Sequence, residues 1–175
     1  MTQRDETLDR RWFLAGLGTS ALIISGGAVI HGGEAWGLEV KALEPQTMLT
    51  LVKLARDIYP HDRLADRFYA VAVKGYDQKA GTDAATRNLI EGGIAKLDDL
   101  AQKKHGVPYA AVAWEAERVA LLRQIEDDPF FQTVRGGLVV SLYNQKELWP
   151  LFGYEGESAA KGGYLERGFD DITWL

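Results

Sequence analysis

The sequence predicts an all-α fold, a small bundle of about five helices with an irregular C-terminal tail. Apolar residues between positions 48 and 142 recur at helical spacing, and glycine or proline separates the runs. No segment alternates polar and apolar residues over a strand's length, and no Asn-Gly or Asp-Gly dipeptide marks a hairpin. A chain of 175 residues has room for one domain. We therefore expect an N-terminal segment, residues 1–35, and a helical domain, residues 36–175, whose tail begins near Glu147.

The composition excludes several classes of function. Hydrophobic residues make up 46% and charged residues 26% of the chain, which is ordinary for a globular protein. A net charge of −5, with no basic stripe in the body of the chain, argues against binding to nucleic acid or to an anionic membrane surface. The chain has no cysteine, which excludes disulfides, iron–sulfur clusters, thiolate zinc sites and covalently bound c-type haem. We expect no cofactor in this chain.

The N-terminal segment has the pattern of a twin-arginine export signal. Arg10 and Arg11 are adjacent, and Phe13 and Leu14 provide apolar residues directly after them. Residues 14–30 carry no charged side chain but are rich in Gly, Ala and Ser, so the stretch is only weakly hydrophobic. Such a segment suits a removable signal, because a permanent membrane span prefers ~20 strongly apolar residues. The sequence therefore predicts export to the periplasm.

Three interpretations of this segment compete. In the first, a signal peptidase recognises the small residues Gly33 and Ala35 and cleaves after Ala35. In the second, the segment remains as an uncleaved membrane anchor. In the third, residues 16–21 form a dinucleotide-binding turn, because they fit the pattern G-x-G-x-x-A. That turn needs a preceding strand, and twin arginines stand there instead, so we interpret this match as accidental.

The first three helices are predicted at about 48–58, 64–79 and 83–105. The signals that separate them are Pro60, Gly81, a cap at Thr82 or Asp83, and His105-Gly106. Their buried faces are expected to consist of Met48, Leu51, Val52, Ala55, Ile58, Phe68, Ala72, Tyr76, Ile90, Ile94, Leu97 and Ala101.

Two further helices follow. The fourth is predicted to start at Pro108, because the missing N–H of proline is tolerated in a first turn. The fifth has Asp128 as its N-cap and Pro129 in its first turn. The inner faces are expected to carry Val112, Ala116, Val119 and Leu122 in the fourth helix, and Phe130, Val134, Leu138 and Leu142 in the fifth.

Two glycine pairs, Gly92-Gly93 and Gly136-Gly137, lie inside predicted helices. Each glycine costs about 1 kcal/mol relative to alanine in a helix. Close packing between helices of the bundle would explain them, and so would a flat surface that a partner's backbone approaches. The sequence leaves both explanations open.

The C-terminal tail combines aromatic residues with glycines. This glycine density argues against a regular helix, and the aromatic residues argue against simple disorder. We expect the tail to lie along a surface, which belongs either to the bundle itself or to a partner protein. The candidate partner-interface residues are Trp149, Phe152, Tyr154, Tyr164, Phe169 and Trp174.

His61 belongs to the best polar cluster in the sequence. Asp62 is beside it, and Arg56 and Asp57 lie one turn earlier on the predicted helix. The cluster would act either as a general base with an orienting carboxylate or as a cap for the helix C-terminus, and we favour the cap. His105, next to Gly106, has the same interpretation. Neither histidine has the spacing of a metal site, so we predict no catalytic and no metal-binding residue.

Two stretches resemble the small subunit of gluconate 2-dehydrogenase, the family known as subunit 3. One is the tail sequence Trp149, Phe152-Gly153-Tyr154-Glu155-Gly156 and Gly162-Gly163-Tyr164, and the other is the helix end Leu54-Ala-Arg-Asp-Ile-Tyr-Pro-His-Asp62. The twin-arginine signal is also typical of that family. The resemblance covers most of the chain, with its specific motifs in these three places.

The resemblance implies a heteromeric complex. A large FAD-bearing subunit of the glucose–methanol–choline oxidoreductase type oxidises a sugar, polyol or sugar acid, and a c-type cytochrome subunit with haem often accepts the electrons. The small subunit would be no enzyme by itself but would carry the export signal for the flavoprotein and stabilise it. The complex would be periplasmic, with membrane contact only through the leader or other subunits.

Two alternatives remain. The chain could be an independent periplasmic helical protein whose tail aromatics line a pocket for a small ligand. It could also be an enzyme that uses the His61 cluster, which turnover by the isolated chain would have to demonstrate.

Overall fold

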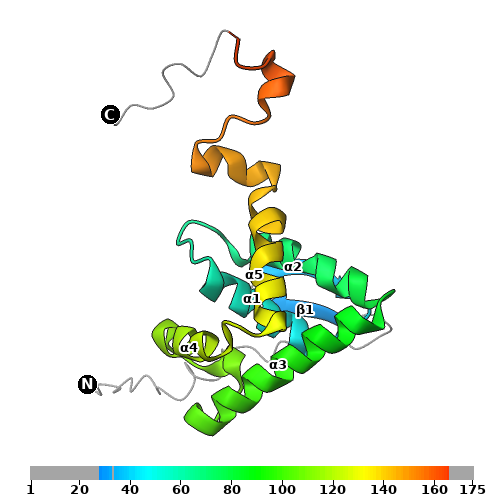
Figure 1. The fold of residues 1–175 in the computed structure, drawn as a ribbon, viewed down its shortest axis with the longest axis vertical. Coiled ribbons are helices and arrows are strands. Elements are labelled where there is room, and N and C mark those ends of the chain that lie inside the picture. Colours follow the sequence, from blue (N-terminus) through cyan, green and yellow to red (C-terminus); the bar gives the residue numbers. More distant parts are fainter. Residues whose placement is uncertain (1–27, 33, 166–175) are drawn as a thin grey trace, which may run out of the picture.

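The computed structural model describes residues 28–32 and 34–165, and it confirms the all-α fold class (Figure 1). Five α-helices form the bundle: α1 (Pro45–Ile58), α2 (Asp66–Ala80), α3 (Ala84–His105), α4 (Glu115–Leu122) and α5 (Pro129–Tyr143). The described residues also include four short 3₁₀ helices, η1 (Tyr109–Ala111), η2 (Arg123–Ile125), η3 (Lys146–Phe152) and η4 (Ser158–Lys161). The predicted helices at 48–58, 64–79 and 83–105 and the helix after Asp128 are confirmed to within a few residues.

The core lies around α2, which packs against α1, α3 and α5. The fifth helix contributes the face that the sequence predicts. Its fully buried residues are Phe130, Val134, Leu138 and Leu142, each 1% exposed or less. The largest fully buried side chains elsewhere include Met48, Leu51, Leu54, Tyr69, Ile90, Leu97, Tyr109, Leu121 and Leu148.

One glycine of each pair lies at a close contact between helices. A Cβ on Gly93 would lie 2.0 Å from Cγ of Phe130, and a Cβ on Gly137 would lie 2.2 Å from the hydroxyl oxygen of Tyr76. At Gly92 a Cβ would meet nothing within 4 Å, and the same holds for Gly136. Packing within the bundle therefore explains half of each pair, and the other half faces open space.

An antiparallel hairpin precedes the bundle and differs from the prediction of an entirely helical chain. It consists of β1 (Ala28–Gly32) and β2 (Glu34–Val40), with a register shift between Ile30 and His31. The sequence pattern did not mark this hairpin, because its strands end in Gly32 and begin again at Glu34, which leaves no two-residue turn between them. β1 lies within the segment that the sequence assigns to the leader, residues 1–35.

The region of the fourth predicted helix also differs from expectation. Pro108 precedes only the single turn of η1, and an extended link leads to α4, which starts at Glu115. The inward face of α4 carries Leu121, Leu122 and Arg118, whereas Ala116 is exposed. Of the predicted face, Val112 and Leu122 are buried as expected, Val119 is half-buried and the prediction for Ala116 is wrong. The sequence pattern did not anticipate that the charged side chain of Arg118 is turned into the core, where it has a buried partner.

Asp77, on α2, holds the connection between β2 and α1. Its carboxylate accepts hydrogen bonds from the backbone N–H groups of Lys41, Ala42 and Leu43, at 2.9 to 3.2 Å. Burial alone would raise the pKa of Asp77, but the three N–H groups and the charge of Lys41 outweigh it, so the pKa lies below its ordinary value of 3.8. The ionised carboxylate thereby fixes the entry of the chain into the bundle.

Replacing Asp77 with alanine is expected to lower the free energy of unfolding by about 2 kcal/mol at pH 7, because three backbone donors lose their acceptor. The effect depends on pH in a defined direction. A carboxyl group with a lowered pKa stabilises the fold above its unfolded value of 3.8, and this contribution is lost as the pH falls through the folded pKa. Urea unfolding at pH 7 and at about pH 3 measures the effect, and the difference between wild type and variant should shrink at the lower pH.

The matched control is Asp62→Ala, since Asp62 is exposed. Its unfolding should follow the wild type at both values of pH. An equal destabilisation by the two substitutions would contradict the role assigned to Asp77.

Candidate partner-binding surface

The chain after α5 forms an arm, residues 146–165, that leaves the end of α5 and extends away from the helices (Figure 1). Its first part is fixed to the bundle. Leu148 is fully buried, and the indole N–H of Trp149 donates to the backbone carbonyl oxygen of Tyr143 at 3.0 Å. Just before the arm, the side-chain amide of Gln145 donates to the backbone carbonyl oxygen of Phe68 at 2.9 Å. The start of the arm is therefore held to the bundle, and the half-exposed ring of Phe152 adds edge-on contacts with His61 and Tyr143.

The outer side chains of the arm are apolar and exposed. The exposed fractions are 52% for Leu151, 44% for Phe152, 48% for Tyr154, 64% for Tyr164 and 88% for Leu165. Left-handed backbone at Gly153, with φ of 70°, turns the chain after η3 and lets Tyr154 pack edge-on against Trp149 at 5.1 Å between ring centroids. Concentrated exposed aromatic and leucine side chains are typical of protein interfaces.

The predicted interface residues fall into three groups. Phe152, Tyr154 and Tyr164 are exposed on the arm, as a partner contact requires. Trp149 is half-buried and holds the start of the arm, because its indole N–H donates to Tyr143 and its ring packs edge-on against Tyr154. The remaining predicted residues lie outside the described part of the chain, namely Phe169, Trp174 and the signal residues Arg10, Arg11, Phe13 and Leu14.

The outer side of α5 adjoins the arm, and together they line an open groove of about 560 Å³. α5 contributes Val139, Val140 and Tyr143, and the chain after it contributes Phe152, Tyr154 and Glu157 among others. Val139 is 50% and Val140 is 65% exposed. The sequence periodicity did not single out these valines, because they fall between the positions of the predicted inner face.

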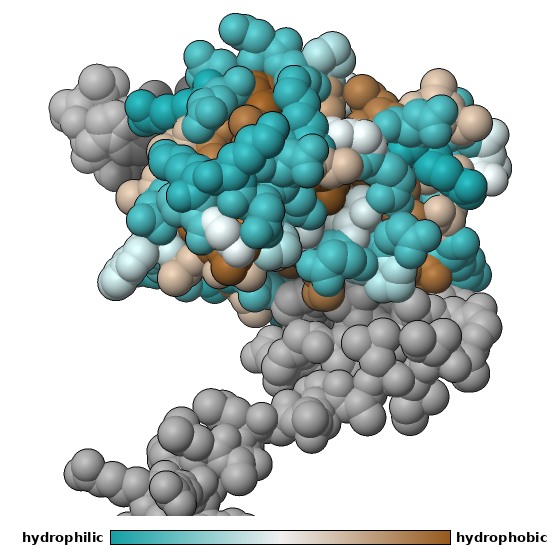
Figure 2. Space-filling model, turned by 90° about the horizontal axis from the view of Figure 1, so that it is seen from below, coloured by the Kyte–Doolittle hydropathy of each residue, from teal (hydrophilic) through white to brown (hydrophobic). Residues whose placement is uncertain are grey.

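The opposite end of the bundle has a different character. Figure 2 views the molecule from below, away from the arm, and shows mostly hydrophilic side chains with scattered apolar ones on that face. The concentration of exposed apolar side chains on the arm and on α5 therefore has no counterpart on the face that Figure 2 shows.

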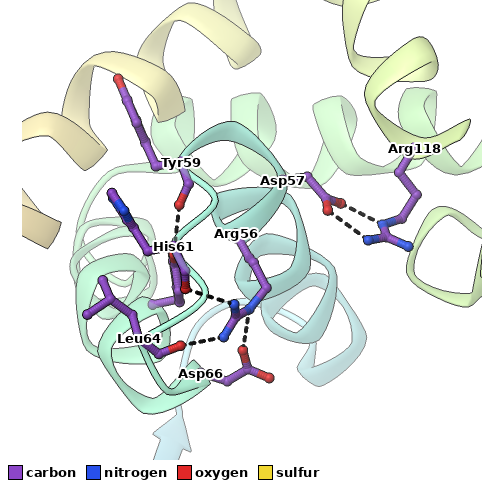
Figure 3. Close-up of polar contacts among 8 residues, drawn as sticks. Arg56, Asp57, Tyr59, His61, Leu64, Asp66 and Arg118 are labelled. Atoms are coloured by element: carbon purple, nitrogen blue, oxygen red, sulfur yellow. Dashed lines mark hydrogen bonds and ion pairs between the residues drawn. The ribbon is translucent and has the colours of Figure 1, made fainter. Parts of the chain in front are cut away.

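The structure does not assemble the polar cluster predicted around His61 (Figure 3). His61 Nε2 lies 2.7 Å from the hydroxyl oxygen of Tyr143, and its ring contacts those of Tyr143 and Phe152 edge-on. Arg56 instead pairs with Asp66 at 2.6 Å and donates to the backbone carbonyls of residues 61 and 64. His61 thus joins the base of the arm to the end of α1 through the aromatic rings around it.

Asp57 faces away from His61, toward α4 (Figure 3). Its carboxylate accepts two hydrogen bonds from the guanidinium of Arg118, at 2.7 and 2.8 Å, and one from the hydroxyl of Tyr109 at 2.7 Å. Burial, together with the adjacent charge of Asp57, raises the pKa of the Tyr109 hydroxyl, so Tyr109 remains a donor. The hydrogen bond with Asp57 raises the pKa of Arg118, which remains charged. This buried triad joins α1, η1 and α4 and has no open side for a substrate.

His105 lies at the end of α3, where Gly106 adopts the predicted left-handed C-cap conformation with φ of 73°. Its Nδ1 is 3.8 Å from a carboxylate oxygen of Glu117, and its Nε2 is buried without a hydrogen-bond partner. In residues 28–32 and 34–165, no three His, Asp or Glu side chains are grouped closely enough to hold a metal ion. Within those same ranges, no helix has the length and apolar character needed to cross a membrane.

Comparisons with protein-family models, with curated protein sequences and with solved structures give no match.

Proposed function

We propose that this chain is a non-catalytic small subunit that binds an FAD-dependent dehydrogenase through its C-terminal arm and provides the export signal for the pair. The observation that carries the proposal is the arm itself, which extends from the bundle with Tyr164 and Leu165 64% and 88% exposed. Such side chains contribute to binding when a partner removes them from water. The flavoprotein as partner, and a haem subunit beyond it, rest on the family resemblance of the tail and of the helix end at Pro60.

The polar groups of the bundle support a structural role. Asp57 is saturated by Arg118 and Tyr109, and Arg56 is held by Asp66 and two carbonyls. A catalytic base needs access to a substrate, and these groups are already paired with one another. The proposal therefore assigns oxidation of the sugar, polyol or sugar acid, together with its FAD, to the partner.

The proposal is tested by co-expression of the chain with a glucose–methanol–choline-type flavoprotein that lacks a signal peptide and is encoded in the same genome. We expect the two proteins to co-purify from the periplasm and the dehydrogenase activity to appear there. Tyr164→Ser/Leu165→Ser should abolish co-purification, because it removes the most exposed apolar side chains of the arm. Arg10→Lys/Arg11→Lys should keep the complex intact but leave it in the cytoplasm.

The matched control is Trp114→Ser. Trp114 is 72% exposed but lies between η1 and α4, outside the arm. Its replacement should change neither co-purification nor location. Periplasmic activity that is independent of Arg10 and Arg11, or binding that is lost equally in all variants, would contradict the proposal.

A further inference from the structure

A second open groove, of about 530 Å³, lies at the base of the arm between the start of α2 and η3, and we call it the α2–η3 groove. It is lined on the α2 side by Arg63, Arg67 and Phe68 and on the η3 side by Glu147, Pro150 and Leu151. The two sides are held together, because the side-chain amide of Gln145 donates to the backbone carbonyl oxygen of Phe68 and Leu148 is fully buried. The groove is therefore already formed in the chain by itself.

The α2–η3 groove is basic, although the protein is acidic. Two basic side chains, Arg63 and Arg67, and one acidic side chain, Glu147, line it, which leaves a net charge of +1. The whole chain carries −5. The nearby carboxylates do not cancel this charge, because Asp62 does not line the groove and Asp66 is paired with an arginine of α1. Opposite charges at such a place select and orient a binding partner.

The two arginines of the groove are held differently. The guanidinium carbon of Arg67 lies 4.6 Å from the centroid of the Phe68 ring, and its Nη2 lies 3.6 Å from a carboxylate oxygen of Glu147. Arg63 is exposed, and within residues 28–32 and 34–165 its side chain has no hydrogen bond or ion pair. A guanidinium is a planar fork of donors that matches a carboxylate. Arg63 is therefore the cation of the groove that is available to an anion.

The apolar part of the groove is continuous with the arm. Leu151 is 52% exposed, belongs to the arm and lines the groove together with Pro150. A free anion would leave Leu151 in water, whereas a segment of a protein would cover it. A partner that covers the arm at Leu151 also reaches Arg63, because both residues line the same groove.

We propose that the α2–η3 groove binds a segment of the protein partner that carries a carboxylate next to an apolar side chain. The carboxylate pairs with Arg63, and the apolar side chain covers Leu151 and Pro150. One carboxylate balances the net charge of the groove, whereas a phosphate group carries more than one negative charge and would also face Glu147. The inference rests on the proposed function, since the same partner covers the arm, and it specifies the chemistry of the surface that this partner presents.

The test measures the dissociation constant between the purified 175-residue chain and the flavoprotein of the co-expression experiment by calorimetry. At about 50 mM NaCl, Arg63→Gln should raise the dissociation constant about fivefold. Arg63→Glu should raise it about 30-fold, because the reversed charge repels the carboxylate of the partner. At about 500 mM NaCl both variants should come closer to the wild type, because salt screens charges near the surface. Arg63 is exposed and unpaired within the described ranges, so urea unfolding of both variants should match the wild type.

The matched control is Arg87→Gln, which removes the same charge from another exposed arginine, on α3 and outside the groove. It should bind the flavoprotein like the wild type. If the wild type does not bind the flavoprotein, the proposed function fails and this inference fails with it. If the wild type binds and Arg63→Gln weakens binding no more than Arg87→Gln, the inference is overturned and the proposed function stands.

Discussion

Replacing Arg118 with methionine is expected to lower the free energy of unfolding by about 3–5 kcal/mol, the cost of leaving a buried carboxylate without its partner. Asp57 and Arg118 are 1% and 5% exposed in their side chains. Arg118 also donates to the carbonyl oxygens of Val112 and Ala113, at 2.8 and 3.0 Å. Its loss therefore removes the link between α1 and α4 together with the support of the segment before α4. Urea unfolding followed by circular dichroism measures the effect.

The control for this substitution is Arg123→Met, since Arg123 is exposed in η2, directly after α4. It should unfold within about 0.5 kcal/mol of the wild type. Combining Arg118→Met with Asp57→Leu should recover part of the loss, because no uncompensated charge remains in the core. If Arg118→Met alone behaves like Arg123→Met, the triad contributes no measurable stability and the assignment is wrong.

The second large effect is expected from Gly93→Ala, which should destabilise the protein by about 3 kcal/mol. A Cβ at this position would lie 2.0 to 2.5 Å from three ring atoms of Phe130, and Phe130 is itself 1% exposed. Neither the ring nor the α3 backbone can move without displacing other core side chains. The same methyl group at Gly92 should instead stabilise the protein by about 0.5–1 kcal/mol, because alanine favours a helix and the space is open.

Thermal and urea unfolding of the two neighbouring variants decide the point. The two substitutions have the same chemistry, the same helix and adjacent positions, so their difference isolates the contact with Phe130. Equal effects of Gly92→Ala and Gly93→Ala would show that α3 and α5 do not approach each other as closely as the structure has them.

The helices could be predicted because their signals are local. Pro60, Asp83, Gly106 and the Asp128-Pro129 pair end or start helices at the expected places, and Asp83 and Asp128 accept the predicted backbone hydrogen bonds. Caps and breaks depend on residues within one turn, so the sequence alone contains them. The hairpin before α1 was missed because its strands overlap the N-terminal segment that the sequence assigned to an export leader.

The polar interior could not be predicted, because its partners are distant in sequence. Asp57 and Arg118 are 61 residues apart, and Asp77 accepts from N–H groups 34 to 36 residues away. The sequence placed Asp57 with His61 because they are neighbours along the chain. Successive helical residues point in different directions, so Arg56 and Asp57 at the end of α1 serve two separate networks.

The sequence predicted which aromatic residues form the candidate surface, but not which of them are exposed for a partner and which hold the arm to the bundle. Phe152, Tyr154 and Tyr164 are exposed as expected for a partner contact, whereas Trp149 holds the arm to Tyr143. The exposure of Val139 and Val140 on α5 could be seen only in the structure, because the sequence of a helix does not by itself show which of its sides the bundle covers.

The hydrogen bonds between the Asp77 carboxylate and the backbone N–H groups of residues 41–43 also affect how the domain responds to mechanical force. A pull on the N-terminus, such as an export machine would exert on a folded passenger, reaches the bundle through the chain before α1. Because Asp77 belongs to α2, that load is shared between α2 and the start of α1 instead of acting on α1 alone. α2 contacts α1, α3 and α5, so tension applied at residues 41–43 is distributed over most of the core. If the proposed export takes place, the bundle would therefore resist a force applied from its N-terminal side through α2 as well as α1.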